Sequence, residues 1–205
     1  MTNSLGRATA LLFGICLFAV SLAAQQSPQT TPQAATSANP QPPTSGFRAE
    51  FLNELKYEED RFVRLAQAMP ADKYTWRPAE GVRSVSEVYM HVAAANLNIP
   101  RVFGVSPPAG FNVQGFDKST SDKTKVIETL QHSFTHMRDA VLNMSDADLE
   151  KQVDWLEGKK NTNRGVMVFI LRHAAEHLGQ SIAYARINGI VPPWTEEQQQ
   201  QKPKQ

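Results

Sequence analysis

Apolar residues recur every three or four positions along four long segments of this 205-residue chain. This spacing places them on one face of an α-helix, whereas a half-buried strand alternates apolar and polar residues, and no segment alternates convincingly. The four segments span residues 46–69, 84–103, 121–143 and 165–188, and a short helix is expected at 145–153. Four helices of about twenty residues predict an all-α protein, an antiparallel four-helix bundle.

Local signals indicate where some of these helices begin and end. Ser84 and Glu87 have the spacing of a capping box, in which each side chain accepts a hydrogen bond from the other residue's backbone. Pro100 lacks a backbone donor and crowds the preceding turn, so the second helix should kink or end near Ile99. Gly189 is expected to stop the fourth helix.

Residues 1–24 have the pattern of a secretory signal peptide. Arg7 precedes an apolar run over residues 8–20, and Ala23 and Ala24 suit cleavage. The apolar run is shorter than the roughly 20 residues that a membrane span needs. The sequence therefore predicts export to the periplasm or the extracellular space by a cleavable signal peptide, without stable membrane insertion. A retained N-terminal membrane anchor is the alternative.

The rest of the chain is predicted to be one domain between two low-complexity segments. Residues 25–45 are rich in Gln, Pro, Ser and Thr and carry no charge, so they cannot bury enough apolar surface to fold and predict a disordered linker. Residues 196–205 predict a disordered tail. Residues 46–195 are long enough for one domain with a sizeable core. Cys16, the only cysteine, lies in the predicted signal peptide, so the mature chain would have no disulfide.

The charge balance argues against a nucleic-acid-binding surface. Lys and Arg total 21 against 20 Asp and Glu, so removal of Arg7 with the signal peptide leaves a formal charge near zero. No basic stripe and no interleaving of basic and aromatic residues occurs. A small-molecule substrate is therefore expected, and the sequence does not identify it.

Three of the five histidines are expected to face the bundle interior. At about 100° per residue, His177 lies about 40° from His173, on a stripe that includes Val166 and Phe169. His91 likewise shares a face with mostly small or apolar residues of the second helix. One inward histidine is more often a satisfied core residue. Three of them, two at the i, i+4 spacing, favour convergence on a cation.

His132 and His136 have the same i, i+4 spacing but a different predicted environment. The apolar stripe of their helix includes Leu130, Phe134 and Met137, and lies about 140–180° away from His132. Both histidines are therefore expected to face water. The direction of the side chains, rather than their spacing, separates the two pairs.

Glu58 is a candidate catalytic carboxylate. It falls on the apolar stripe of the first helix, together with Phe51, Leu55, Phe62 and Leu65. A carboxylate on a core face needs a compensating partner. Glu58 therefore either pairs with an arginine or serves the same polar site as the histidines, where it could act as a base.

Residues 47–194 resemble the DinB/YfiT-like superfamily. The resemblance rests on "SVSEVYMHVAAAN" in the second helix, "HAAEHLGQSIAYARINGIVPPW" in the fourth, and the earlier loop "YTWRPAEGVRS". It implies an antiparallel four-helix bundle and a divalent metal bound by His91, His173 and His177. Members with known chemistry include thiol-dependent S-transferases and isomerases, and many members have no assigned reaction.

The expected function is that of a metal-dependent enzyme that activates water or a thiol at the three-histidine site. Zinc is the first expectation for the metal, and nickel, iron or manganese are alternatives. A hydrolase is favoured over a thiol S-transferase because export would separate the protein from a cytosolic thiol cofactor. Glu58 is the candidate base.

A non-catalytic, exported metal-binding or protein-interaction module is the alternative function. Leu171, Ala175, Leu178 and Ile182 form a second apolar stripe on the fourth helix, opposite the histidines. This stripe predicts either a helix that is packed on both sides or the face of a homodimer. An open coordination position would favour catalysis, and a fourth protein ligand would favour a structural role.

Overall fold

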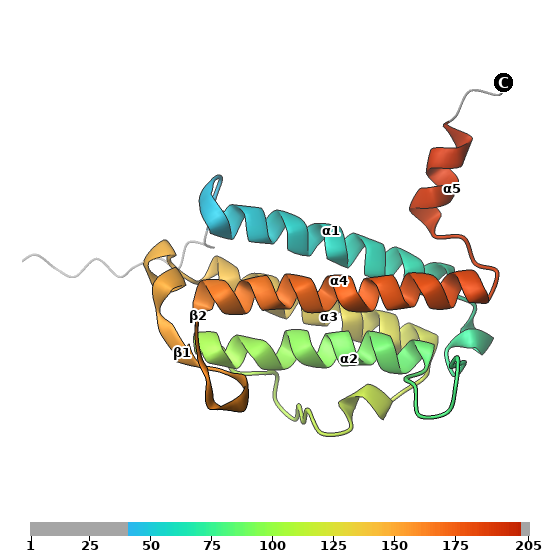
Figure 1. Ribbon diagram of the computed structural model, residues 1–205, viewed down its shortest axis with the longest axis horizontal. Helices are drawn as coiled ribbons and strands as arrows, with labels where there is room; N and C mark the ends of the chain where they lie inside the picture. The colour runs from blue at the N-terminus through green and yellow to red at the C-terminus, as the bar shows by residue number, and fades with distance from the viewer. Residues whose placement is uncertain (1–40, 202–205) are drawn as a thin grey trace, which may run out of the picture. The chain divides into compact units, whose positions relative to one another are not determined.

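Residues 41–201 are described by a computed structural model and form a helical bundle (Figure 1). Its long helices are α1 (Gly46–Ala68), α2 (Val85–Asn98), α3 (Lys123–Leu142) and α4 (Asn163–Ile187). A hairpin of β1 (Gln152–Asp154) and β2 (Lys160–Thr162) precedes α4, and α5 (Pro193–Gln200) follows it. The all-α, four-helix-bundle fold is therefore confirmed. Within the described range, no helix is both long enough and apolar enough to cross a membrane.

The hydrogen bonds between helix ends show in which direction each of the four helices runs. Lys123, at the start of α3, donates from Nζ to the carbonyl oxygen of Met69, just past the end of α1, at 2.8 Å. Tyr184, near the end of α4, donates to the carbonyl oxygen of Arg83, just before α2, at 3.1 Å. α1 and α4 thus run one way and α2 and α3 the other (Figure 1). This order requires a long return between α2 and α3, which residues 104–122 provide.

The packing of the helices places α2 beside α4. Each of α1 and α2 packs on both α3 and α4. The core between the helices is made of apolar and aromatic side chains that are almost fully buried, among them Phe51, Leu55, Phe62, Tyr89, Leu130, Phe134, Met137 and Val166. The ring of Phe62 meets Tyr89 edge-on at 6.3 Å between ring centroids. The antiparallel neighbours α2 and α4 can therefore bring side chains from distant parts of the sequence together.

The expected ends of α2 are confirmed. Ser84 Oγ accepts from the backbone of Glu87 at 3.3 Å, and Glu87 Oε2 accepts from the backbone of Ser84 at 2.8 Å, which completes the capping box. The α-helix ends at Asn98, and a 3₁₀ turn over Ile99–Phe103 contains Pro100. Proline is tolerated in the first turn of a helix because its missing donor is not needed there.

The segment 145–153 differs from the single short helix that was expected. A 3₁₀ turn occupies Asp146–Glu150, and β1 then pairs with β2 in antiparallel register, with Gln152 opposite Thr162. The chain reverses at Glu157 and Gly158, whose φ angles are 57° and 71°. Strands of three residues are too short to produce a recognisable alternation of apolar and polar positions, so periodicity does not detect this hairpin.

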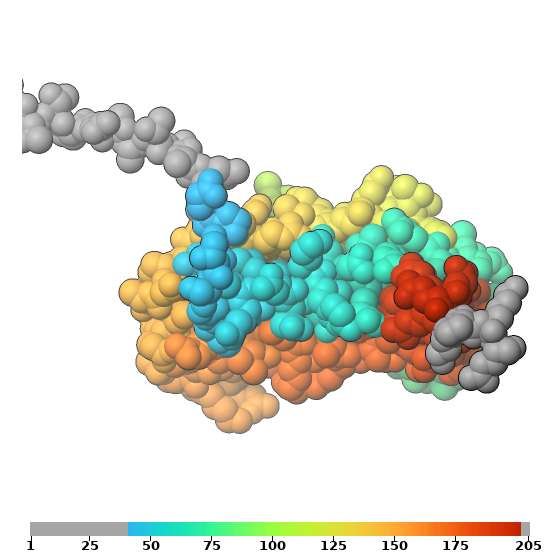
Figure 2. All heavy atoms as spheres, turned by 90° about the horizontal axis from the view of Figure 1, so that it is seen from above, coloured from blue at the N-terminus to red at the C-terminus, as the bar shows by residue number. Residues whose placement is uncertain are grey.

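The C-terminal segment also differs from expectation. Residues from 196 onward were expected to be disordered, but α5 extends to Gln200 and lies against the C-terminal part of α1 (Figures 1 and 2). Glu197 forms an ion pair with Arg64, and the Trp194 ring lies 4.6 Å from the guanidinium of Arg61. These contacts with α1 stabilise a helix whose own composition is too polar to predict it. The predicted signal peptide and residues 25–40 of the predicted linker lie outside the described residues.

Candidate metal centre

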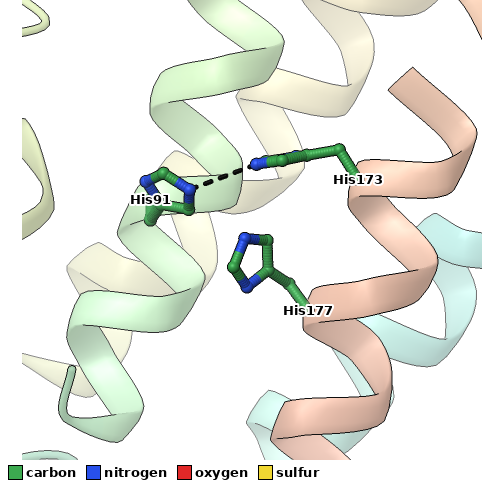
Figure 3. A group of neighbouring side chains, drawn as sticks. All are labelled: His91, His173 and His177. Carbon is green, nitrogen blue, oxygen red and sulfur yellow. Dashed lines mark hydrogen bonds between the residues drawn. The ribbon is translucent and has the colours of Figure 1, made fainter. Parts of the chain in front are cut away.

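Three imidazoles converge between α2 and α4 (Figure 3). His91 comes from α2, and His173 and His177 come from successive turns of α4. One ring nitrogen of each lies within 4.8 Å of those of the other two. Nε2 of His173 is 3.1 Å from Nε2 of His91. The structure therefore brings together the three histidines that the sequence analysis assigned to one site, although they are far apart in the chain.

Burial keeps two of these imidazoles neutral. It lowers the pKa of His91 to about 4, and the nearby positive charge of Arg83 lowers this pKa further. Burial likewise lowers the pKa of His173 to about 4, with His177 as the next cause. At neutral pH these rings are uncharged, which is the form of imidazole that binds metal ions. Two imidazole nitrogens at 3.1 Å attract only when a proton or a cation lies between them.

A chain of hydrogen bonds fixes the orientation of His177. The carbonyl of Arg83 can only accept, so the hydroxyl of Tyr184 donates to it at 3.1 Å. The Tyr184 oxygen then accepts from Nε2 of Gln180 at 2.9 Å, which leaves Gln180 Oε1 facing Nδ1 of His177 at 2.9 Å. Nδ1 of His177 must therefore carry a proton, and in the neutral form of the ring Nε2 then holds the lone pair. Second partners of this kind commonly set the tautomer of metal-binding histidines.

The donor set fits a divalent transition metal. Two nitrogens that bind one zinc ion tetrahedrally, each at about 2.0–2.1 Å, lie about 3.4 Å apart. The observed 3.1 Å between His91 and His173 is close to this value. In residues 41–201, no carboxylate or thiolate belongs to the cluster, so three imidazole nitrogens define it. Imidazole suits zinc, copper, iron and nickel.

A groove of about 900 Å³ opens onto the cluster, and His91 and His173 lie in its wall. The hairpin contributes Trp155, whose ring meets Phe169 edge-on at 5.1 Å. Phe169 in turn stacks on His173, with 5.9 Å between centroids. The groove therefore gives the three-histidine site direct access to solvent and to a small molecule.

The groove is the part of the site that the sequence analysis missed. Its walls combine α2 and α4 with the hairpin and with the connection 104–122, which contributes Asp117. Asp117 accepts from Nε of Arg83 at 3.2 Å, and both side chains lie beside His91. No motif links these residues, because only the path of the chain around the bundle brings them together.

Glu58 lies elsewhere. It is only 8% exposed, and burial raises its pKa to about 7, while the charge of Arg61 acts in the opposite direction. It belongs neither to the three-histidine cluster nor to the groove wall. Within residues 41–201 Glu58 also forms no ion pair, and its Oε2 has no hydrogen-bond partner. The structure thus brings Glu58 to neither of the two partners that the sequence suggested.

His132 and His136, the second pair at the i, i+4 spacing, agree only partly with expectation. His132 is exposed, but His136 is half-buried, and its Nε2 is buried without a hydrogen-bond partner. Burial lowers the pKa of His136. The expectation that both face water was therefore wrong for His136. Neighbouring elements cover a wider part of the surface of α3 than the apolar stripe of this helix indicates. Neither residue belongs to the three-histidine cluster.

The second apolar stripe of α4 is mostly used within the bundle. Leu178 belongs to the hydrophobic core, Leu171 and Ile182 pack against that core, and Ala175 is exposed. α4 packs on α1 as well as on α2. The stripe therefore corresponds to a helix that is packed on two sides, and the homodimer stays a prediction.

Comparison with known proteins identifies related sequences. The model of the DinB superfamily matches residues 54–181. YjoA of Bacillus subtilis (strain 168) is 24% identical over 128 residues, which make up 61% of this chain and 80% of YjoA. The range matched by the family model, residues 54–181, contains α2 and most of α4, the two helices that supply the histidines.

Solved structures share the fold. A DinB-like protein of Bacillus cereus superposes with a TM-score of 0.62 at 19% identity, over 70% of this chain and 93% of that one. YjoA superposes with a TM-score of 0.52 at 20% identity, over 68% and 92%.

YfiT of Bacillus subtilis superposes with a TM-score of 0.58 at 14% identity, over 73% of this chain and 94% of YfiT. YfiT is described as a probable metal-dependent hydrolase with an unusual four-helix bundle topology. Because the family model covers more than half of the sequence and includes all three clustered histidines, the chain belongs to the DinB superfamily.

Proposed function

We propose that this protein is an exported, metal-dependent enzyme that activates water or a thiol at the three-histidine site, with hydrolysis favoured. The observation that carries the proposal is the opening of the groove onto the histidine cluster. A structural metal site is usually closed by four protein ligands, whereas a catalytic site keeps a position open. Three histidine donors with a groove in front of them correspond to the catalytic arrangement.

Each part of the site has a distinct task in this proposal. His91, His173 and His177 would hold a divalent ion, for which zinc is the first candidate. A bound ion supplies Lewis acidity, which lowers the pKa of water or of a thiol and polarises a substrate carbonyl. Gln180 holds His177 in the tautomer whose Nε2 is free to bind. The groove walls, including Trp155 and Phe169, bind and orient the substrate.

Two arguments favour hydrolysis over transfer to a thiol. The predicted signal peptide would carry the chain away from cytosolic thiol cofactors, and water needs no separate carrier. YfiT, which shares the fold, is described as a probable metal-dependent hydrolase. Glu58 is not assigned a role in proton transfer, because it lies in neither the cluster nor the groove wall.

The decisive experiment is metal analysis of the full chain purified without a chelator or a histidine tag. We expect about one divalent ion per chain by inductively coupled plasma mass spectrometry. His91→Ala and His177→Ala should each lose it, and the matched control His132→Ala should keep it, because His132 is exposed on α3. Circular dichroism of each variant checks that the bundle has folded.

The results of the metal analysis distinguish a metal-dependent enzyme from a non-catalytic interaction module. Metal loss in only the two clustered variants supports the site and justifies hydrolase assays with ester, amide and phosphoester substrates, with and without added thiol. Absence of an ion after zinc, nickel, iron and manganese have each been offered would contradict the proposal and favour a non-catalytic interaction module.

A further inference from the structure

The groove in front of the histidines has the size and the wall chemistry of a site for a small organic molecule. Its volume of about 900 Å³ lies within the range of small-molecule sites, about 300–1,000 Å³. The wall includes the apolar side chains of Ile99, Val102, Trp155 and Phe169. Such walls bind the apolar body of a ligand, and a few polar groups then determine its orientation.

Apolar side chains also mark the mouth of the groove. Val113 and Leu156 are 51% and 57% exposed, and both line the groove. Val113 belongs to the connection between α2 and α3, whereas Leu156 belongs to the turn of the hairpin. Exposed apolar residues on two separate segments of one groove indicate a surface that a ligand covers.

The charges in the groove do not balance. Its wall contains three cationic side chains and two carboxylates. Asp117 pairs with Arg83, and Asp154 pairs with Lys160. The remaining cation, Arg101, forms no ion pair among residues 41–201, and its one side-chain hydrogen bond, to Asn98, is 3.5 Å long. The histidines bring no negative charge, so the groove carries an uncompensated positive charge.

The separation of Arg101 from the histidines indicates how long a ligand must be to contact both. His91 and Arg101 are ten positions apart on α2 and the 3₁₀ turn that continues it, which corresponds to about 15 Å along a helix axis. Both residues line the same groove. A molecule that contacts both therefore has its anionic group remote from the bond that reacts.

We propose that the groove binds a small molecule with an apolar body and an anionic group, and that Arg101 binds the anion. Guanidinium binds a carboxylate or phosphate through two parallel N–H donors, and this bidentate contact gives both affinity and orientation. The apolar walls hold the body so that its other end reaches His91 and His173. The idea that the bound molecule reacts rests on the proposed function. The preference for an anionic ligand depends only on the residues of the groove.

Binding of a matched pair of probes tests this preference. The probes are 6-phenylhexanoate and its uncharged amide, titrated by calorimetry into the chain in the presence of a chelator, so that the carboxylate has no metal to bind. We expect the carboxylate to bind at least tenfold more tightly than the amide. Acetate, which has the carboxylate without the apolar body, should not compete.

Variants then assign the preference to one side chain. Arg101→Gln should reduce the affinity ratio of the two probes to about one while leaving the affinity for the amide unchanged, and Arg101→Lys should keep part of the ratio. Arg186→Gln removes an exposed cation at the far end of α4 and should change nothing. Equal affinity for the two probes in the unchanged chain, or a ratio that survives in Arg101→Gln, would overturn the assignment.

The same titration separates this inference from the proposed function. Because the probes are titrated with a chelator present, their binding does not depend on whether the three histidines hold an ion. If the unchanged chain shows the preference but binds no metal in the metal analysis, the groove assignment is supported and only the enzymatic role is contradicted. Failure of both probes to bind the unchanged chain would contradict the groove assignment, whatever the metal content.

Discussion

At the scale of single residues, the least obvious part of the site is the chain of hydrogen bonds behind His177. The direction of these hydrogen bonds is set at the end remote from the three-histidine cluster, since the carbonyl of Arg83 can only accept. Tyr184 and Gln180 transmit that constraint to Nδ1 of His177. The tautomer of His177 is thus determined by a backbone atom just before α2.

The first prediction concerns Gln180. Gln180→Leu should weaken zinc binding by about 10–100-fold, because His177 loses the acceptor that holds its proton on Nδ1. Gln180→Glu keeps an acceptor at this position and should restore most of the affinity. The measurement is a competition titration with a chromophoric chelator, together with ¹⁵N chemical shifts of His177 in the metal-free chain. Unchanged shifts and affinity in Gln180→Leu would contradict the role of the hydrogen bond.

The second prediction concerns Glu58, whose pKa is raised from 4.5 to about 7 by burial. A raised carboxyl pKa means that the unfolded chain loses this proton first as pH rises. Glu58 therefore destabilises the fold progressively between about pH 4.5 and pH 7, and fully above that range. Glu58→Gln removes the penalty, so it should raise the free energy of unfolding by about 1–3 kcal/mol at pH 8 and by little at pH 4.

Urea unfolding of the unchanged chain and of Glu58→Gln from pH 4 to pH 9 measures this difference in the free energy of unfolding. A stability difference that does not grow with pH would show that Glu58 is compensated in the folded chain. Loss of turnover in Glu58→Gln at unchanged metal content would instead establish the catalytic role that its position in the sequence suggested.

At the scale of secondary structure elements, the sequence predicts what depends on helical periodicity. The four long helices follow from the spacing of apolar residues, and the same periodicity separates the clustered pair on α4 from His132 and His136 on α3. This works because one helix face determines burial over many turns. His136 marks the limit, since a residue at the edge of a stripe is covered or exposed according to its neighbours.

Short elements and connections carry no comparable signal. Each strand of the hairpin has three residues, and α5 depends on contacts of Trp194 and Glu197 with α1. The connection 104–122 determines that α2 and α3 run in the same direction, which helical spacing alone cannot reveal. The groove is assembled from these same parts, so the clustering of the three histidines was predictable while Arg101 and Trp155 as groove residues were not.

At the scale of the whole molecule, the predicted export would determine which reactions are available to the site. The predicted signal peptide has its apolar run at residues 8–20, and the following residues 25–45 carry no charge. If the chain is exported as predicted, its one cysteine, Cys16, would be removed with the signal peptide, so the mature protein would have no thiol that could form a disulfide in an oxidising space. A water-activating enzyme suits this location, as it needs no soluble thiol.

The third prediction is therefore that the full chain, expressed in a bacterium, is recovered outside the cytoplasm as a shortened protein that begins near Gln25. Leu12→Arg interrupts the apolar run and should leave an unprocessed chain in the cytoplasm, whereas Ala34→Arg, the same change in the predicted linker, should be exported and processed normally. Cell fractionation with mass spectrometry of the intact chain measures both location and length. A full-length chain that remains with the membranes after alkaline washing would contradict cleavage and establish the N-terminal anchor. A full-length chain in the cytoplasm would remove the main reason for preferring water over a thiol at the three-histidine site.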